Sequence, residues 1–222
     1  VLINDYAESN GFVSFAPYYS HLFTTPTSSD SVEWIKLLAI HEGRHMVQRN
    51  KLSDGTGKGA WSFLFGDLGT NVFAFFYVPA WFLEGDAVVT ETALTRGGRG
   101  RSPSFDLYQR GIELYGKRYS YYKTYLGSYD SLYPYPDHYR LGYLLCSYIT
   151  RHYGKDIWER VLDNTGSYFL FYTFDSSLQI ETGRSIRELY MDAMNEYSVM
   201  WKKQLEGTRF TEADVLLSGK DD

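Results

Sequence analysis

The most restrictive feature of this 222-residue sequence is the segment 32–50, VEWIKLLAIHEGRHMVQRN. Its apolar residues recur on more than one side of a helix, which predicts a helix buried in a core. His41 and His45 are four residues apart and therefore lie one turn apart on the same face. Two imidazoles in this arrangement can bind one metal ion, and Zn²⁺ suits them well. Glu42 directly follows His41 and is placed to take a proton from a water molecule at such a metal.

The start and the interior of this helix carry further signals. Asp30 or Ser31 is expected to cap its N-terminus, and Glu33 adds a negative charge to the first turn. Gly43 is unexpected, because glycine inside a helix costs about 1 kcal/mol relative to alanine. It either lets another element approach closely or has no role. The alternative to a zinc site is a pair of ordinary buried histidines, so the zinc interpretation needs a third ligand.

A third ligand is predicted on a second helix, PAWFLEGDAVVTETAL, which Pro79 opens. Glu84 lies there among apolar residues, where a carboxylate needs a partner such as zinc. Glu91 follows two turns later on the same face and is placed to hold a ligating histidine by a hydrogen bond. The alternatives are a salt-bridged helix carboxylate for Glu84 and an exposed one for Glu91.

These motifs resemble those of the gluzincin class of zinc metallopeptidases. In that class the third zinc ligand is a glutamate, commonly in a W-L-x-E-G-x-A context, and here HEGRH is followed by WFLEGDAVVTE. The resemblance implies one Zn²⁺ per chain, bound by His41, His45 and Glu84, with Glu42 as the catalytic base. It also implies an α+β, zincin-like fold and a peptide or protein substrate.

Two further segments extend the resemblance. LFTTP at 22–26 and TETALTRGGRGRSP at 90–103 are similar to bacterial gluzincin domains that often precede a TolB-like β-propeller in secreted or periplasmic proteins. The resemblance therefore implies an extracytoplasmic location and a covalently linked C-terminal β-propeller outside this sequence.

The segment Tyr139–Gly142, YRLG, is similar to the YxxG element of the gluzincin aminopeptidases. The tyrosine hydroxyl of that element stabilises the oxyanion, and the resemblance assigns this role to Tyr139. His138 is an alternative donor, because other gluzincins use a histidine. A YxxG segment that arises by chance is a further alternative in a chain with 21 tyrosines. The aminopeptidase G-x-M-E-N element is absent, and the spacing from His45 to Glu84 is longer than in those enzymes. The sequence therefore predicts an endopeptidase by default.

Composition argues against several other classes of function. The net charge is −5 and no basic stripe runs along the chain, so nucleic acid is not an expected partner. The single cysteine, Cys146, has an apolar helical context and is expected to be a buried hydrophobic residue. The longest apolar run, 72–83, is shorter than the roughly 20 residues that a transmembrane helix needs. Because the chain begins at Val1 without a signal sequence, we expect a mature chain or an excised domain.

Three arginines cluster in a glycine-rich loop: Arg96, Arg99 and Arg101. Either they bind a carboxylate of the substrate or they hold the loop to acidic neighbours. We expect the structural role.

The other segments predict one catalytic unit with two parts. In residues 1–50, a polar lead-in is followed by strands at 11–16 and 20–25 and then by the motif helix. Residues 51–222 are expected to be mostly helical and to carry the third ligand. Within them we expect a loop at 51–60 and helices at 105–117, 137–154, 156–164 and 185–205. Asp137 is expected to cap its helix, and Ser185 and Glu188 to form a capping box at the start of the last one. Irregular structure is expected at 120–136, because Pro134 and Pro136 interrupt regular structure.

Two other functions are compatible with the same motifs. The domain could serve a larger cell-envelope protein as a catalytically silent interaction module, although such a site would have no need of Glu42. A zinc hydrolase with a non-peptide substrate would share every motif and differ only in the cleft.

Overall fold

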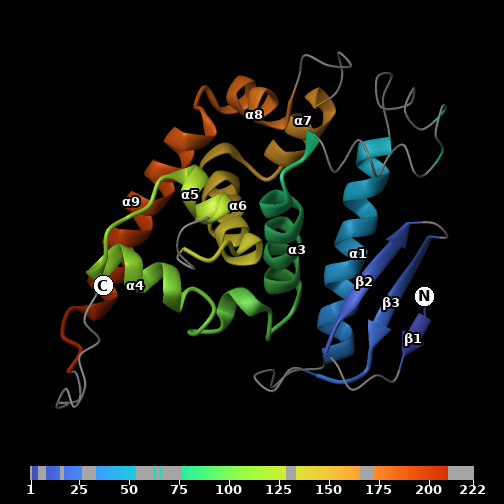
Figure 1. Ribbon diagram of the computed structural model, residues 1–222, viewed down its shortest axis with the longest axis horizontal. Coiled ribbons are helices and arrows are strands. Elements are labelled where there is room, and N and C mark those ends of the chain that lie inside the picture. The colour runs from blue at the N-terminus through green and yellow to red at the C-terminus, as the bar shows by residue number, and fades with distance from the viewer. Residues whose placement is uncertain are drawn as a thin grey trace.

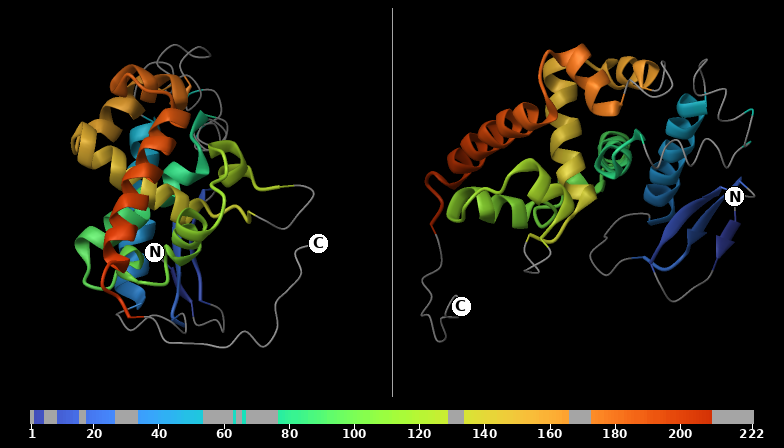
Figure 2. Two further views of the ribbon diagram at one scale, coloured as in Figure 1. Left: turned by 90° about the vertical axis from the view of Figure 1, so that its left-hand side faces the viewer. Right: turned by 45° about the horizontal axis from the view of Figure 1, so that its top comes forward.

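In the computed structural model of the chain, the described residues are 2–4, 9–15, 18–26, 34–53, 63, 66, 77–128, 134–165 and 173–209. They form a small β-sheet and a larger, mostly helical part, which is consistent with the predicted α+β class. Figure 1 shows the order of the layers, with helix α1 between the sheet and α3, and α6 on the far side of α3. The sheet and α9 lie at opposite ends of the molecule (Figure 2).

The sheet has three strands in the described part of the chain: β1 (Leu2–Asn4), β2 (Gly11–Phe15) and β3 (Tyr18–Phe23). β3 is central, with β1 parallel and β2 antiparallel to it. β2 and β3 confirm the two predicted strands to within two residues. The expectation of a polar lead-in at residues 1–10 is wrong, because β1 lies within it. A strand of three residues shows no alternation of its own and is fixed only by its pairing with the distant β3.

Helix α1 (Trp34–Ser53) packs against this sheet and confirms the predicted motif helix. Leu38 of α1 lies directly under Gly11 of β2, where a Cβ on the glycine would be 2.5 Å from Leu38 Cδ1. α1 continues past residue 50, so the first residues of the predicted loop at 51–60 are helical. The predicted cap at residue 30 or 31 and the predicted first-turn charge at residue 33 lie outside the described residues, as does the rest of that loop.

Helices α3 (Ala80–Leu94) and α6 (His138–Tyr153) form the centre of the helical part. Pro79 is the N-cap of α3, and the Asp137 side chain caps α6 by accepting a hydrogen bond from the Arg140 amide, as predicted. The two helices approach so closely that Gly85 of α3 faces Gly142 of α6. A Cβ on Gly142 would overlap the Trp81 carbonyl oxygen and lie 2.7 Å from Gly85 Cα. This contact fixes α3, and therefore Glu84, relative to the start of α6.

The remaining helices surround this pair and enclose an aromatic core that includes Trp81, Phe82, Trp158 and Phe174. They are the short 3-10 helix η1 (Arg99–Arg101), α4 (Leu107–Tyr115), α5 (Tyr121–Leu126), α7 (Ile157–Asn164), α8 (Phe174–Thr182) and α9 (Ile186–Leu205). Cys146 is fully buried in this core, as predicted. None of the described helices is long and apolar enough to cross a membrane.

Two local predictions in the helical part have different outcomes. Ser185 and Glu188 form the predicted capping box at the start of α9. The expectation of irregular structure over 120–136 is wrong at its start, where Ser120 caps α5 by accepting from the Lys123 amide. Pro134 and Pro136 lie beyond α5, so they do not prevent a helix upstream of them.

Candidate metal centre

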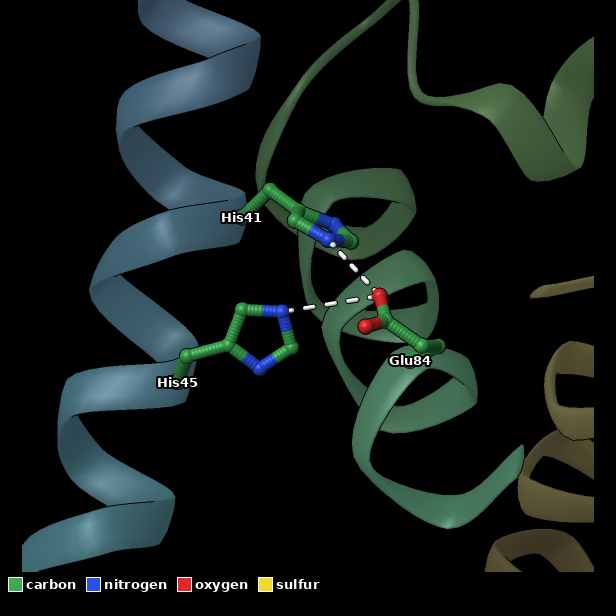
Figure 3. A group of neighbouring side chains, drawn as sticks. All are labelled: His41, His45 and Glu84. Carbon is green, nitrogen blue, oxygen red and sulfur yellow. Dashed lines mark hydrogen bonds and ion pairs between the residues drawn. The ribbon is translucent and has the colours of Figure 1, made fainter. Parts of the chain in front are cut away.

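His41, His45 and Glu84 converge at one point between α1 and α3 (Figure 3). The Glu84 Oε2 atom lies 3.3 Å from His41 Nε2 and 3.5 Å from His45 Nε2. Two ligands of a tetrahedral zinc ion, each bound at about 2.0–2.1 Å, are about 3.3–3.4 Å apart. The two distances from Glu84 therefore fit two edges of a zinc tetrahedron, and all three ligand atoms lie within 4.8 Å of one another. Among the described residues, His41, His45 and Glu84 form a group that could hold a metal ion.

The charge of Glu84 also suits a metal ligand. Burial by itself would raise the pKa of Glu84, but its hydrogen bonds with His41 and His45 outweigh burial and lower that pKa. The carboxylate is therefore ionised at neutral pH. Burial lowers the pKa of the His45 imidazole, but its contact with Glu84 outweighs burial and raises that pKa.

Glu91 orients His41 through the Nδ1 atom of its ring. Its Oε2 atom lies 3.0 Å from His41 Nδ1, and the residue is fully buried, which excludes the alternative of an exposed carboxylate. Arg99 donates to both Glu91 oxygens, from Nε at 2.7 Å and from Nη2 at 3.0 Å. Burial raises the pKa of Glu91, but the hydrogen bonds with His41 and Arg99 outweigh it and lower that pKa.

The tautomer of His41 depends on this contact. Arg99 Nη2 lies 2.7 Å from His41 Nδ1, so without a metal Nδ1 can either accept from Arg99 or donate to Glu91. A metal ion at Nε2 requires the tautomer with hydrogen on Nδ1, in which Glu91 accepts it. Glu91 thus occupies the position predicted for a residue that supports a ligating histidine.

Gln48 orients His45, a role that was not predicted from the sequence. Its Oε1 atom lies 2.9 Å from His45 Nδ1, while its Nε2 donates to Asp86 Oδ2 at 2.7 Å and to the Leu83 carbonyl at 3.0 Å. Because the amide nitrogen has two acceptors, the amide oxygen must face His45. His45 Nδ1 therefore donates to Gln48, which leaves Nε2 as the nitrogen that can bind a metal ion.

This chain of hydrogen bonds ends at an ion pair. Asp86 Oδ2 accepts from Arg44 Nε at 2.7 Å, and Asp86 is itself buried. The signal available in the sequence was Gln48 three residues after His45, on the same helical face, together with an aspartate in the apolar segment FLEGDAVV.

We predict that Gln48→Ala weakens zinc binding about 10- to 100-fold, the usual cost of losing a partner that orients a ligating histidine. The measurement is zinc affinity by competition with a fluorescent chelator. Gln204→Ala is the matched control, because Gln204 is exposed near the end of α9. Equal affinities in the two variants would show that Gln48 does not orient His45.

Glu42 is buried beside the ligands, with an exposed fraction of 4%. Burial is the largest influence on it and raises the pKa of its carboxyl group, although His45 and His41 lower it. A carboxylate whose pKa is raised toward neutrality is a stronger base than one in water. This is the property that a catalytic base at position 42 needs.

The structure brings Tyr139 to the cluster and does not bring His138 there. The Tyr139 ring centroid lies 6.1 Å from that of His41, and the nearby Glu84 carboxylate acts on the Tyr139 hydroxyl. Burial and the Glu84 carboxylate raise the pKa of Tyr139 to about 12, so its hydroxyl keeps its proton near neutral pH. The His138 ring instead contacts Tyr125 of α5, with 5.3 Å between centroids.

A cleft of about 670 Å³ opens beside these residues, and His41, Glu42 and Tyr139 line it. Its other walls are residues 9–11 at the start of β2, apolar side chains of α1, and most of the segment 96–105. The buried base and the tyrosine hydroxyl thus face a space large enough for several residues of a peptide.

No protein-family model, curated protein or solved structure matches this chain. The function must therefore be argued from the residues of the site.

Proposed function

We propose that this chain is a zinc-dependent metallopeptidase of the gluzincin type, with one Zn²⁺ held by His41, His45 and Glu84. The observation that carries the proposal is the convergence of three ligand atoms from two helices beside a cleft that contains a buried glutamate. The distances from Glu84 to the two histidines fit tetrahedral zinc. The zincin-like fold is part of the same proposal.

Each residue then has a defined role in peptide-bond hydrolysis. Bound zinc supplies a Lewis acid and lowers the pKa of a water molecule. Glu42 accepts the proton of the attacking water and later delivers it to the nitrogen of the departing amine. The Tyr139 hydroxyl donates a hydrogen bond to the carbonyl oxygen as negative charge develops there. Glu91 and Gln48 hold the two imidazoles in the required tautomers.

The resemblance to bacterial gluzincin domains supports two wider proposals. We place the protein outside the cytoplasm, in the periplasm, the cell envelope or the medium, with a β-propeller following it in the same polypeptide. Endopeptidase action on peptides or proteins is the preferred form of the reaction, because the aminopeptidase G-x-M-E-N element is absent.

The proposal predicts that the purified protein binds about one zinc per chain and that Glu84→Ala loses it, since two histidines alone leave the site without its third ligand. Metal content is measured by mass spectrometry on both proteins and on Glu206→Ala, whose side chain is exposed after α9. Chelation is expected to abolish cleavage of a mixed peptide library, and added Zn²⁺ to restore it.

The two alternatives give different results in this experiment. A wild-type protein that contains no zinc and cannot be reloaded with it would refute the proposal that the chain is a zinc enzyme. A protein that holds zinc but cleaves no peptide would favour the interaction module or a hydrolase with a different substrate.

A further inference from the structure

The cleft beside the metal site has a cationic wall. Four arginines and two glutamates are among the described residues that line it, although the chain as a whole has a net charge of −5. The two glutamates are Glu42, which is next to the ligand His41, and Glu91, which is bound to Arg99. The excess positive charge is therefore local to this cleft, and a local charge of one sign in a cleft attracts the opposite charge.

The arginines of this wall differ in what they already bind. Arg99 is paired with Glu91, and Arg140 is paired with Asp137. Of the three loop arginines, Arg99 therefore has the structural role that was expected of them. Arg101 is exposed and donates only to backbone carbonyls at the end of α3, those of Thr92 and Thr95, so no carboxylate neutralises it in the described structure.

Arg96 is the arginine that the fold leaves available. It is exposed, it lines the cleft, and no described residue forms a hydrogen bond or an ion pair with its guanidinium. A guanidinium presents several N–H donors in one plane and binds a carboxylate with two of them. Its position one residue after the C-cap of α3 is also favourable for a cation, which is the structural alternative to ligand binding.

The loop that carries Arg96 and Arg101 is held firmly in place. The Gly100 amide donates to Thr92 Oγ1 at 3.1 Å, and the Arg99 amide donates to Glu91 Oε1 at 3.1 Å. Gly98 packs so tightly that a Cβ would lie 2.6 Å from the Thr92 backbone nitrogen. A loop fixed in this way loses little freedom when a ligand binds, which favours recognition of charge.

We propose that Arg96, assisted by Arg101, binds a carboxylate of the substrate, so that the preferred peptides carry a negative charge close to the cleaved bond. This inference rests on the proposed function and names the substrate class of the same site. The carboxylate has two sources in a peptide, an aspartate or glutamate side chain and the C-terminal carboxylate.

The experiment uses four versions of one library peptide that the wild type cleaves, with Glu or Gln beside the cleaved bond and with a free or an amidated C-terminus. The expected result is that kcat/KM is about tenfold higher for peptides with the recognised carboxylate, since a hydrogen-bonded charge pair contributes about 1.5 kcal/mol or more. Arg96→Gln is expected to abolish this tenfold difference in kcat/KM, and a higher salt concentration is expected to reduce it. Dependence on Glu identifies the side chain as the source, and dependence on the free terminus identifies the C-terminal carboxylate.

Arg187→Gln is the matched control, because Arg187 is an exposed arginine on α9, outside the residues that line the cleft. It is expected to keep the wild-type ratio. Equal cleavage of all four peptides by the wild type, or a ratio that Arg96→Gln does not change, would overturn the proposal while leaving the peptidase intact.

Binding separates this inference from the proposed function. The same peptides, fluorescently labelled, are titrated by anisotropy against Glu42→Gln and against the double variant Glu42→Gln/Arg96→Gln. Weaker binding of only the carboxylate-bearing peptides to the double variant would support carboxylate recognition even if the wild type cleaved nothing. No difference in binding between the two variants would count against it.

Discussion

Glu42→Gln is expected to lower kcat/KM for peptide hydrolysis about 10²- to 10⁴-fold, the usual contribution of a general base, while zinc content stays unchanged. Glutamine has nearly the same shape as glutamate but cannot accept the proton of the attacking water. Glu42 is not one of the three converging ligands, so its replacement leaves the metal centre intact. The measurement is steady-state cleavage of a library peptide, with metal content determined on the same samples.

The control for this substitution is Glu206→Gln, which changes an exposed glutamate after α9 and is expected to cleave at the wild-type rate. Full activity in zinc-loaded Glu42→Gln would refute its role as the base. Equal inactivity of wild type and variant, both with zinc bound, would support a catalytically silent module. The intact Glu42 is the reason that we favour catalysis over that module.

Gly142→Ala is expected to reduce the free energy of unfolding by about 3 kcal/mol, at the upper end of the usual cost of overpacking a core. The added methyl group would overlap the Trp81 carbonyl oxygen and lie 2.7 Å from Gly85 Cα. Both neighbours are backbone atoms, so a change of side-chain rotamer cannot relieve the overlap and the two helices must separate. Stability is measured by chemical denaturation of the zinc-free protein, which removes the contribution of metal binding.

Gly111→Ala is the matched control for Gly142→Ala. Gly111 lies within α4, and a Cβ there would have no described atom within 4 Å. Alanine is the better helix former, so this variant is expected to gain up to about 1 kcal/mol. Similar free energies for the two variants would show that the contact between α3 and α6 tolerates a methyl group.

The separation of α3 and α6 would also affect the metal site. Glu84 is on α3 and Tyr139 is in the first turn of α6, so the position of the Tyr139 hydroxyl relative to Glu84 depends on the distance between these helices. The glycines in the EGxA and YxxG segments are therefore explained by packing. Gly43 has no such role among the described residues, because a Cβ there would meet nothing within 4 Å.

The sequence by itself determined the features that depend on local geometry. The spacing of His41 and His45 places both on one face of any helix. Pro79 marks a helix start through its fixed backbone angle, and Asp137 marks one through its capping side chain. Glu84 could be predicted as the third ligand because a carboxylate in an apolar segment needs a partner. Ser185 and Glu188 identified their capping box for the same local reason.

Only the tertiary structure decided how these elements meet. His138 and Tyr139 are neighbours on one helix and point about 100° apart, so the packing of α6 on α3 had to select which of them reaches Glu84. Likewise, Gln48 is held by Asp86 of α3, and Glu91 is bound by Arg99 of the loop after α3. The three arginines of that loop look equivalent in the sequence, yet Arg99 is bound to buried Glu91, while Arg96 remains exposed in the cleft. Contacts between residues distant in sequence decided these outcomes, and local propensity carries no information about such contacts.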